Sequence, residues 1–117
     1  MYEYKAIVKS AYDGDTVTLD IDLGCWVWLH NEKCRLHGID TPELRGSEEE
    51  KARGRAARDW VRSKILDQEV MIRTYRDKTG KYGRLLVDIL FTDPDDGKTK
   101  NLGTELVELG HAVYRRY

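Results

Sequence analysis

Four acidic residues lie where the sequence predicts turns or strand ends, so their side chains are free to converge. Asp13 and Asp15 flank Gly14, which is expected to supply the turn conformation, and Asp40 and Glu43 enclose a Thr-Pro pair that ends a strand. Carboxylates and backbone carbonyls are ligands of hard cations, and Ca²⁺ takes about six to eight oxygens. These residues therefore suit either a cation site or ordinary turns, in which Asp-Gly-Asp and Asp-Thr-Pro are both common.

Two arginines lie inside otherwise apolar segments. Arg35 stands between a cysteine and a leucine, and Arg84 precedes three consecutive aliphatic residues. A guanidinium in such a place needs an anion, and its planar fork matches phosphate or carboxylate. Each arginine is therefore either an anion-binding residue or half of a structural salt bridge. Arg35 and Asp40 are five positions apart and would point to opposite faces of an ideal strand, so they share a site only if the chain bends, for which Gly38 is suited.

The cysteines, histidines and tryptophans support weaker hypotheses. Two cysteines and two histidines could be combined into a zinc site, although they lack the close pairs typical of such sites: Cys25, His30, Cys34 and His37. Reduced, partly buried thiols are the favoured interpretation. The tryptophans are interpreted as packing residues of the core or its rim, with base stacking as the alternative for the first two: Trp26, Trp28 and Trp60.

All of these residues must be positioned by a modest core. The chain has 117 residues, of which 40% are hydrophobic and 35% charged. This composition fits one domain over residues 1–117 and excludes disordered and collagen-like classes. No apolar run approaches the roughly 18 residues of a membrane span. The first residues also lack an apolar export signal, so we expect a cytoplasmic protein, or a secreted one if a signal has been removed.

The charge is balanced overall but unevenly distributed. The net charge is -1, yet residues 1–40 carry four basic and seven acidic side chains, whereas residues 71–86 carry five basic and one acidic. This distribution suits a cation site next to an anion site, or else a solvated pair of strands. The total predicts only modest long-range attraction for nucleic acid.

Hydrophobic periodicity predicts three strands, a long helix, two strands and a short helix. The strands are expected over residues 4–11 and 16–22, from a Trp-rich stretch through a turn near His30-Asn31 to Ile39, and over 69–76 and 82–91. The helices are expected from Ser47, as a capping box with Glu50, to residue 66, and over 101–109. Five strands with a helix between the third and fourth match a β-rich α+β fold, a five-stranded OB-type barrel.

Four motifs, in this order, resemble the staphylococcal nuclease (thermonuclease) family. They are Asp13-Gly14-Asp15-Thr16-Val17, Arg35-Leu36 leading into Asp40-Thr41-Pro42-Glu43, Lys81-Tyr82-Gly83-Arg84, and the short-helix segment from Asn101 to Ala112. The resemblance extends over about residues 4–112. It implies a five-stranded OB barrel with helices, which agrees with the strand count.

The resemblance also implies a function and a set of site residues. The function is a Ca²⁺-dependent nuclease that cleaves DNA, and RNA as a second substrate, with little sequence preference and leaves 3′-phosphate ends. The resemblance implies that Asp15, Asp40 and the Thr41 carbonyl bind Ca²⁺ and that Glu43 is the general base. It implies that Arg35 and Arg84 bind the phosphate and stabilise its transition state. It also implies that Lys81 and Tyr82 contact nucleotide phosphate, and that Tyr114 and Tyr117 contact bases. We expect a monomer that does not bind membranes. The main alternative is a non-catalytic OB-fold nucleic-acid-binding module, followed by an OB domain that binds peptide or sugar.

Overall fold

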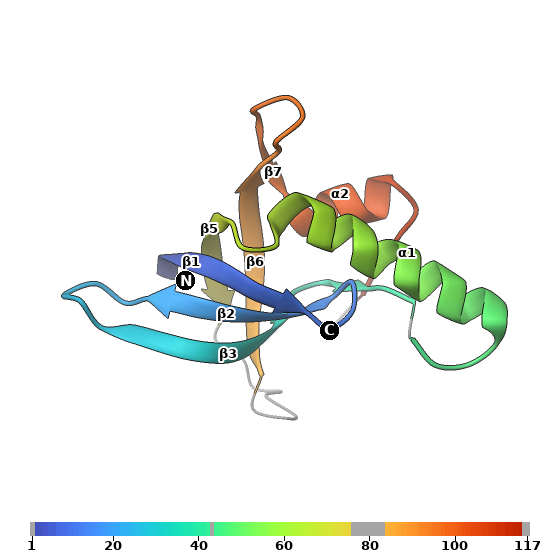
Figure 1. The fold of residues 1–117 in the computed structure, drawn as a ribbon, viewed down its shortest axis with the longest axis horizontal. Helices are drawn as coiled ribbons and strands as arrows, with labels where there is room; N and C mark the ends of the chain where they lie inside the picture. Colours follow the sequence, from blue (N-terminus) through green and yellow to red (C-terminus); the bar gives the residue numbers. More distant parts are fainter. Residues whose placement is uncertain (1, 43, 76–83, 116–117) are drawn as a thin grey trace.

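The computed structural model describes residues 2–42, 44–75 and 84–115. Strands and two helices follow one another along the chain (Figure 1): β1 Tyr2–Ala11, β2 Thr16–Asp22, β3 Trp28–Leu36, β4 Ile39–Asp40, α1 Glu48–Ile65, β5 Glu69–Tyr75, β6 Leu85–Thr92, β7 Thr99–Asn101, α2 Leu102–Glu108 and β8 Val113–Tyr114. No helix in these ranges is both long and apolar enough to cross a membrane.

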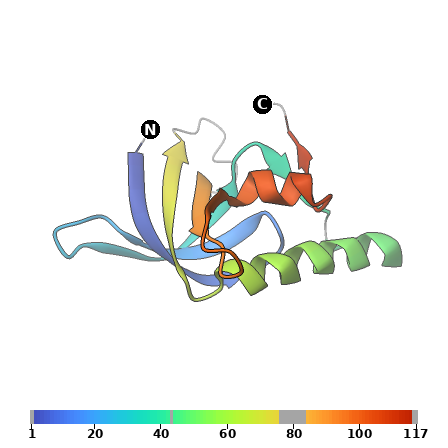
Figure 2. The same ribbon diagram turned by 90° about the horizontal axis from the view of Figure 1, so that it is seen from above.

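Five of the strands close into a mixed barrel. The strands of the large sheet follow the order β3-β2-β1-β5-β6-β7, and β3 also pairs with β6, in parallel, which joins the two sides of the sheet. β7 pairs antiparallel with the last residues of β6 at the edge of the sheet, and the short strands β4 and β8 pair separately (Figure 2). The arrangement confirms the predicted β-rich α+β fold with an OB-type barrel.

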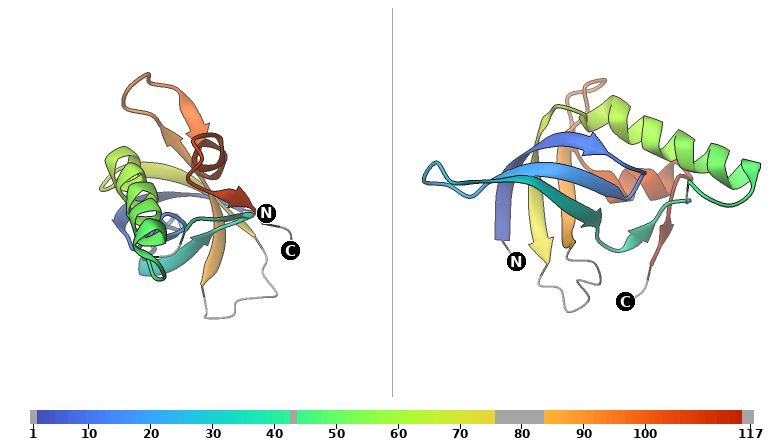
Figure 3. Two further views of the ribbon diagram at one scale, coloured as in Figure 1. Left: turned by 90° about the vertical axis from the view of Figure 1, so that its right-hand side faces the viewer. Right: turned by 60° about the horizontal axis from the view of Figure 1, so that its bottom comes forward.

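The barrel core follows the alternation that the sequence predicts. Val17, Leu19 and Ile21 of β2 are buried, while the residues between them are only half-buried. Both helices lie beside the barrel (Figure 3), and α1 contributes buried residues such as Val61 and Ile65. Burial of this aliphatic surface contributes roughly 25 cal/mol per Å² to folding, so the core holds the strands that carry the acidic turns.

The helix caps form as predicted. The Ser47 side chain accepts the N–H of Glu50 at 3.2 Å at the start of α1. The Asn101 side chain accepts the N–H of Thr104 at 3.2 Å at the start of α2, and Gly110 follows its end with a φ of +79°. Each cap satisfies an N–H that has no partner within the helix.

The hairpin between β2 and β3 differs from the prediction. The turn expected near His30-Asn31 is wrong, because the chain reverses over residues 24–27, where the Val27 N–H donates to the Gly24 carbonyl at 2.9 Å. Asn31 instead lies within β3 at a φ of +57°, at a shift in the β2–β3 register. Its N–H donates to an Asp20 carboxylate oxygen at 2.9 Å. Asparagine tolerates this conformation, so the signal taken for a turn marks a β-bulge.

The hairpin tip carries apolar side chains outside the core. Trp26 is 97% exposed, so its interpretation as a packing residue is wrong, and Trp28 lies on the hairpin surface stacked on His30. The prediction holds for Trp60, which packs edge-to-face on Phe91 at the rim of the core.

The two cysteines lie in different environments. Cys25 is exposed near the hairpin tip, whereas Cys34 is buried in β3. Burial raises the pKa of the Cys34 thiol to about 12, with the nearby charge of Glu32 adding to the rise. The partly buried thiol that the sequence favoured is therefore correct for Cys34 and wrong for Cys25.

A buried carboxylate ties α1 to the end of β6. Asp93 accepts hydrogen bonds from Lys64 Nζ at 2.9 Å and Lys100 Nζ at 2.8 Å, and from the backbone N–H of Asp95 at 3.0 Å. These donors, Lys100 foremost, hold the pKa of the Asp93 carboxyl well below its ordinary value of 3.8. The carboxylate thus favours the folded state only while it is ionised.

Asp93 should therefore give the protein an acid-sensitive contribution to stability. Because its pKa is lower in the folded chain than in the unfolded chain, the contribution is complete above about pH 5 and is lost as the pH falls toward the folded pKa. The Asp93→Asn variant should be less stable at neutral pH and lose less stability on acidification. Urea denaturation at a series of pH values measures this, with Asp59→Asn, in an exposed pair with Arg58, as the control. Equal acid dependence in Asp93→Asn and the wild type would contradict the assignment.

Candidate active site

Asp15, Arg35 and Asp40 meet where β2 begins and β3 ends. Arg35 Nη2 lies 3.4 Å from Asp15 Oδ2 and forms a close ion pair with Asp40 Oδ1. Arg35 Nη1 donates to the carbonyls of Leu36 at 3.1 Å and Ile39 at 3.2 Å. One guanidinium thus joins two carboxylates and is itself oriented by two backbone carbonyls.

The bend between Arg35 and Asp40 forms as predicted. Gly38 has a φ of +79°, a conformation that favours glycine, in the turn between β3 and β4. The neighbouring His37 ring stacks on Tyr75, with ring centroids 3.8 Å apart. This bend allows Arg35 and Asp40 to reach the same site although their spacing in an ideal strand would separate them.

Asp15 is held in place by backbone and side-chain donors. It is only 8% exposed, and its Oδ2 accepts the backbone N–H of Thr41 at 3.1 Å. The Thr16 hydroxyl lies 3.3 Å from its other oxygen. In the same turn the backbone N–H of Asp15 donates a hydrogen bond to the Asp13 side-chain oxygen Oδ1 at 3.0 Å. Burial, reinforced by the neighbouring Asp15 carboxylate, raises the pKa of Asp13 to about 6.

Gly14 is required for close packing rather than for the predicted turn conformation. Its φ is not in the left-handed region where five other glycines lie among the described residues. A Cβ at Gly14 would stand 2.7 Å from Cγ2 of Thr41 and 3.0 Å from Cβ of Ala57 in α1. Glycine therefore allows the acidic turn to approach both Thr41 and α1.

The structure brings two further predicted residues toward this cluster. Arg84 is half-buried and directly precedes β6, where Leu86 lies opposite Arg35 in the parallel β3–β6 pair. Tyr114 is 67% exposed in β8, opposite Ile39 of β4. The remaining predicted site residues lie outside the described residues: Glu43, Lys81, Tyr82 and Tyr117.

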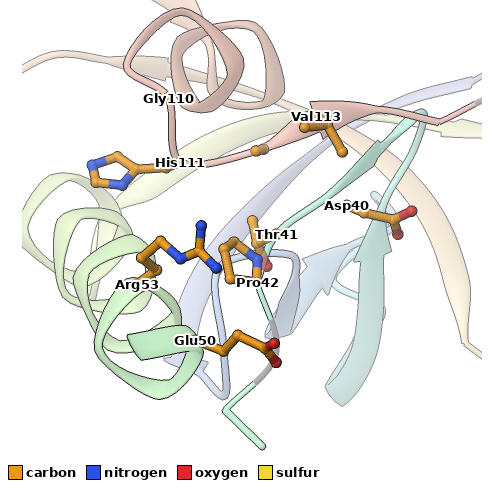
Figure 4. A pocket seen from close by; sticks show the side chains of 9 residues that line it. Asp40, Thr41, Pro42, Glu50, Arg53, Gly110, His111 and Val113 are labelled. Atoms are coloured by element: carbon orange, nitrogen blue, oxygen red, sulfur yellow. The ribbon is translucent and has the colours of Figure 1, made fainter. Parts of the chain in front are cut away.

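Sequence reasoning did not identify three basic residues near the cluster. Arg115 Nη1 lies 3.5 Å from Asp40 Oδ1, and Arg53 and His111 line a groove of about 390 Å³ beside Thr41 (Figure 4). The full lining is Asp40, Thr41, Pro42, Glu50, Arg53, Gly110, His111, Ala112 and Val113. No sequence signal marks Arg53, because it is one of many charged residues in α1.

The oxygen atoms around Asp15 fit a hard cation in part. The carboxylates of Asp15 and Asp40 approach the same nitrogen of Arg35, and the backbone of Thr41 is hydrogen-bonded to Asp15. Two carboxylates and one carbonyl suit Ca²⁺, with water and a phosphate oxygen in its other positions. Within residues 2–42, 44–75 and 84–115, no group of three or more His, Cys, Asp or Glu side chains is arranged to hold a metal ion.

Comparison with known proteins agrees with this geometry. The sequence model of the family described as "Staphylococcal nuclease homologue" matches residues 33–117, a stretch that contains Arg35, Asp40 and Thr41. A thermonuclease from Staphylococcus intermedius is 32% identical over 88 residues, which cover 74% of this chain and 49% of the relative. The chain thus spans about half the length of that curated relative. The barrel, the acidic and arginine cluster and both matches lead to one assignment: the chain belongs to the staphylococcal nuclease family.

Proposed function

We propose that the chain is a Ca²⁺-dependent nuclease that hydrolyses phosphodiester bonds of DNA, and of RNA as a second substrate, with little sequence preference, leaving 3′-phosphate ends. The observation that supports it most is the convergence of Asp15, Arg35 and Asp40, in which one guanidinium contacts both carboxylates. Membership of the nuclease family supports the same reaction.

The ordered charges around Arg35 suit phosphodiester hydrolysis. Asp15, Asp40 and the Thr41 carbonyl are the residues that would hold Ca²⁺, which supplies positive charge against the negative charge that develops on the phosphoryl oxygens. Arg35 would bind the same phosphate. Its two carbonyl contacts fix the guanidinium in advance, and fixed charges stabilise a transition state without the cost of reorganisation. Arg84 would supply the second guanidinium.

The remaining roles follow from the family motifs. Glu43 would accept the proton of the attacking water, and an ionised carboxylate needs no raised pKa for this role. The bond that breaks is the one from phosphorus to the 5′ oxygen, which leaves the phosphate on the 3′ end. Lys81 and Tyr82 would contact nucleotide phosphate, and Tyr114 and Tyr117 would contact bases, a role that the exposure of Tyr114 favours.

Digestion of plasmid and single-stranded DNA in Ca²⁺, in Mg²⁺ and in chelator tests the proposal. We expect cleavage in Ca²⁺, none in chelator, and 3′-phosphate ends on the products. Glu43→Gln should lower kcat by about 10²–10⁴-fold because it removes the proton acceptor. The control Glu69→Gln, at an exposed residue at the start of β5, should leave kcat unchanged.

Two outcomes would contradict the nuclease. Cleavage in chelator would exclude the metal-dependent reaction, and an unimpaired Glu43→Gln variant would exclude the proposed base. Binding of DNA without cleavage under every metal would instead favour the non-catalytic binding module.

A further inference from the structure

The groove beside Asp40 and Thr41 carries two basic side chains that the proposed mechanism does not use. Arg53 comes from α1, and His111 comes from the segment after α2. Figure 4 shows the Arg53 guanidinium reaching from α1 toward Thr41 and Pro42, with the His111 ring above it. Two elements far apart in the sequence thus place basic residues along one groove, whose lining also includes the candidate cation ligands Asp40 and Thr41.

The charge of Arg53 is available to a ligand. Arg53 is exposed, and its side chain makes no hydrogen bond or ion pair with another residue in the described part of the chain. Glu49 and Glu50 stand at helical spacing from it, yet neither pairs with it. Glu50 turns toward the loop before α1, where its carboxylate fills the space that a side chain at Gly46 would occupy. By contrast, Arg35 is engaged with carboxylates in the cluster next to the groove.

The size and surface of the groove fit more than a free anion. Its volume of about 390 Å³ falls within the roughly 300–1,000 Å³ typical of ligand sites. Pro42, Ala112 and Val113 form apolar parts of the lining, and Val113 is 66% exposed. A phosphate needs only the basic groups, whereas a nucleotide also uses an apolar wall for its sugar or base.

We propose that this groove binds the nucleotide adjacent to the cleaved bond, with Arg53 and His111 holding its phosphate and Pro42 and Val113 contacting its sugar or base. The inference rests on the proposed nuclease function, because the groove shares Asp40 and Thr41 with the candidate cation site. A nucleic-acid strand that leaves the cleaved phosphate along this groove passes directly in front of Arg53.

The test compares Arg53→Gln and His111→Gln with Arg55→Gln, a change at an exposed arginine of α1 that is not part of the groove. Binding of a fluorescent single-stranded octanucleotide is measured in chelator over a series of salt concentrations. Arg53→Gln should weaken binding roughly tenfold, as expected for one charge-assisted hydrogen bond. It should also reduce the slope of log K against log salt by about 0.7, the value for one phosphate contact on a single strand.

Kinetics in Ca²⁺ provide the second measurement. Arg53→Gln should raise KM for the octanucleotide with kcat unchanged. It should leave a dinucleoside monophosphate unaffected, because that substrate has no phosphate beyond the cleaved one for Arg53 to hold. Behaviour equal to that of Arg55→Gln, or an equal loss with both substrates, would overturn the subsite. If the wild type binds but never cleaves, the nuclease proposal fails, while an Arg53-dependent salt slope still supports the groove. If the wild type cleaves normally and Arg53→Gln changes neither binding nor KM, the proposed subsite is refuted while the nuclease proposal stands.

Discussion

Replacing Arg35 by glutamine is expected to abolish most cleavage and, at the same time, to tighten the binding of Ca²⁺ alone. The loss of cleavage follows from removing a preorganised charge beside the reacting phosphate, which typically costs about 10²–10³ in kcat, or roughly 3–4 kcal/mol. The guanidinium is well placed for that role, since its side chain is only 13% exposed and two backbone carbonyls orient it.

The gain in Ca²⁺ affinity follows from the same geometry. Arg35 contacts both Asp15 and Asp40, so its positive charge opposes the approach of a cation to either carboxylate. Without it, the dissociation constant for Ca²⁺, measured by calorimetry in the absence of substrate, should fall by roughly tenfold, or about 1.4 kcal/mol. The metal-free variant should be less stable by about 1–3 kcal/mol, because the buried Asp15 carboxylate loses a partner.

Two comparison variants separate these effects. Arg35→Lys retains the positive charge but not the planar fork, so cleavage should still fall while Ca²⁺ affinity stays near that of the wild type. Arg58→Gln, which removes an arginine paired with Asp59 on α1, should change neither property. A Ca²⁺ affinity that is unchanged in Arg35→Gln would show that the guanidinium does not compete with the cation for these carboxylates.

The sequence predicted the barrel because its main strands alternate clearly. The buried and half-buried residues of β2 alternate without interruption, and the caps at Ser47 and Asn101 mark both helix starts. The turn of the hairpin after β2 was predicted at the wrong residues because asparagine is common both in turns and in β-bulges. Asn31 adopts the left-handed conformation in a bulge, whereas the turn is formed by residues 24–27, where Cys25 and Trp26 also have positive φ values. Neither residue type predicts such a conformation.

The candidate site could be predicted only where its residues are close in the sequence. Arg35, Asp40 and Thr41 belong to one short segment, and the bend at Gly38 was expected from the difficulty of bringing the first two together. Arg53 and His111 are 58 positions apart, and their place in one groove depends on how α1 and the segment after α2 pack on the barrel. No local pattern carries that information.

Gly14→Ala is expected to disrupt both the fold and the site, because the new methyl group would overlap Thr41. Its Cβ would stand 2.7 Å from the Thr41 Cγ2 and 3.0 Å from the Ala57 Cβ, so the acidic turn would have to move. Overpacking of this kind costs about 1–3 kcal/mol of stability. The movement would also disturb the hydrogen bond from the Thr41 N–H to Asp15. A displacement of about 1 Å in such a site can lower activity by about 10²-fold.

A second substitution in the same contact can restore what Gly14→Ala removes. Thr41→Ser deletes the Cγ2 methyl but keeps the hydroxyl and the backbone, so the double variant should regain part of both stability and cleavage, a non-additivity that a double-mutant cycle measures. Gly24→Ala is the matched control, because among the described residues no atom beyond its two chain neighbours would lie within 4 Å of the new Cβ, and its φ is +84°. Its cost should be limited to backbone strain of about 1 kcal/mol, with cleavage unaffected. Two results would contradict this account: a Gly14→Ala variant that behaves like Gly24→Ala, or a double variant in which Thr41→Ser restores neither stability nor cleavage. Either would show that contact with Thr41 is not the reason for a glycine at position 14. The acidic turn would then be less tightly coupled to the candidate cation ligands than the distances indicate.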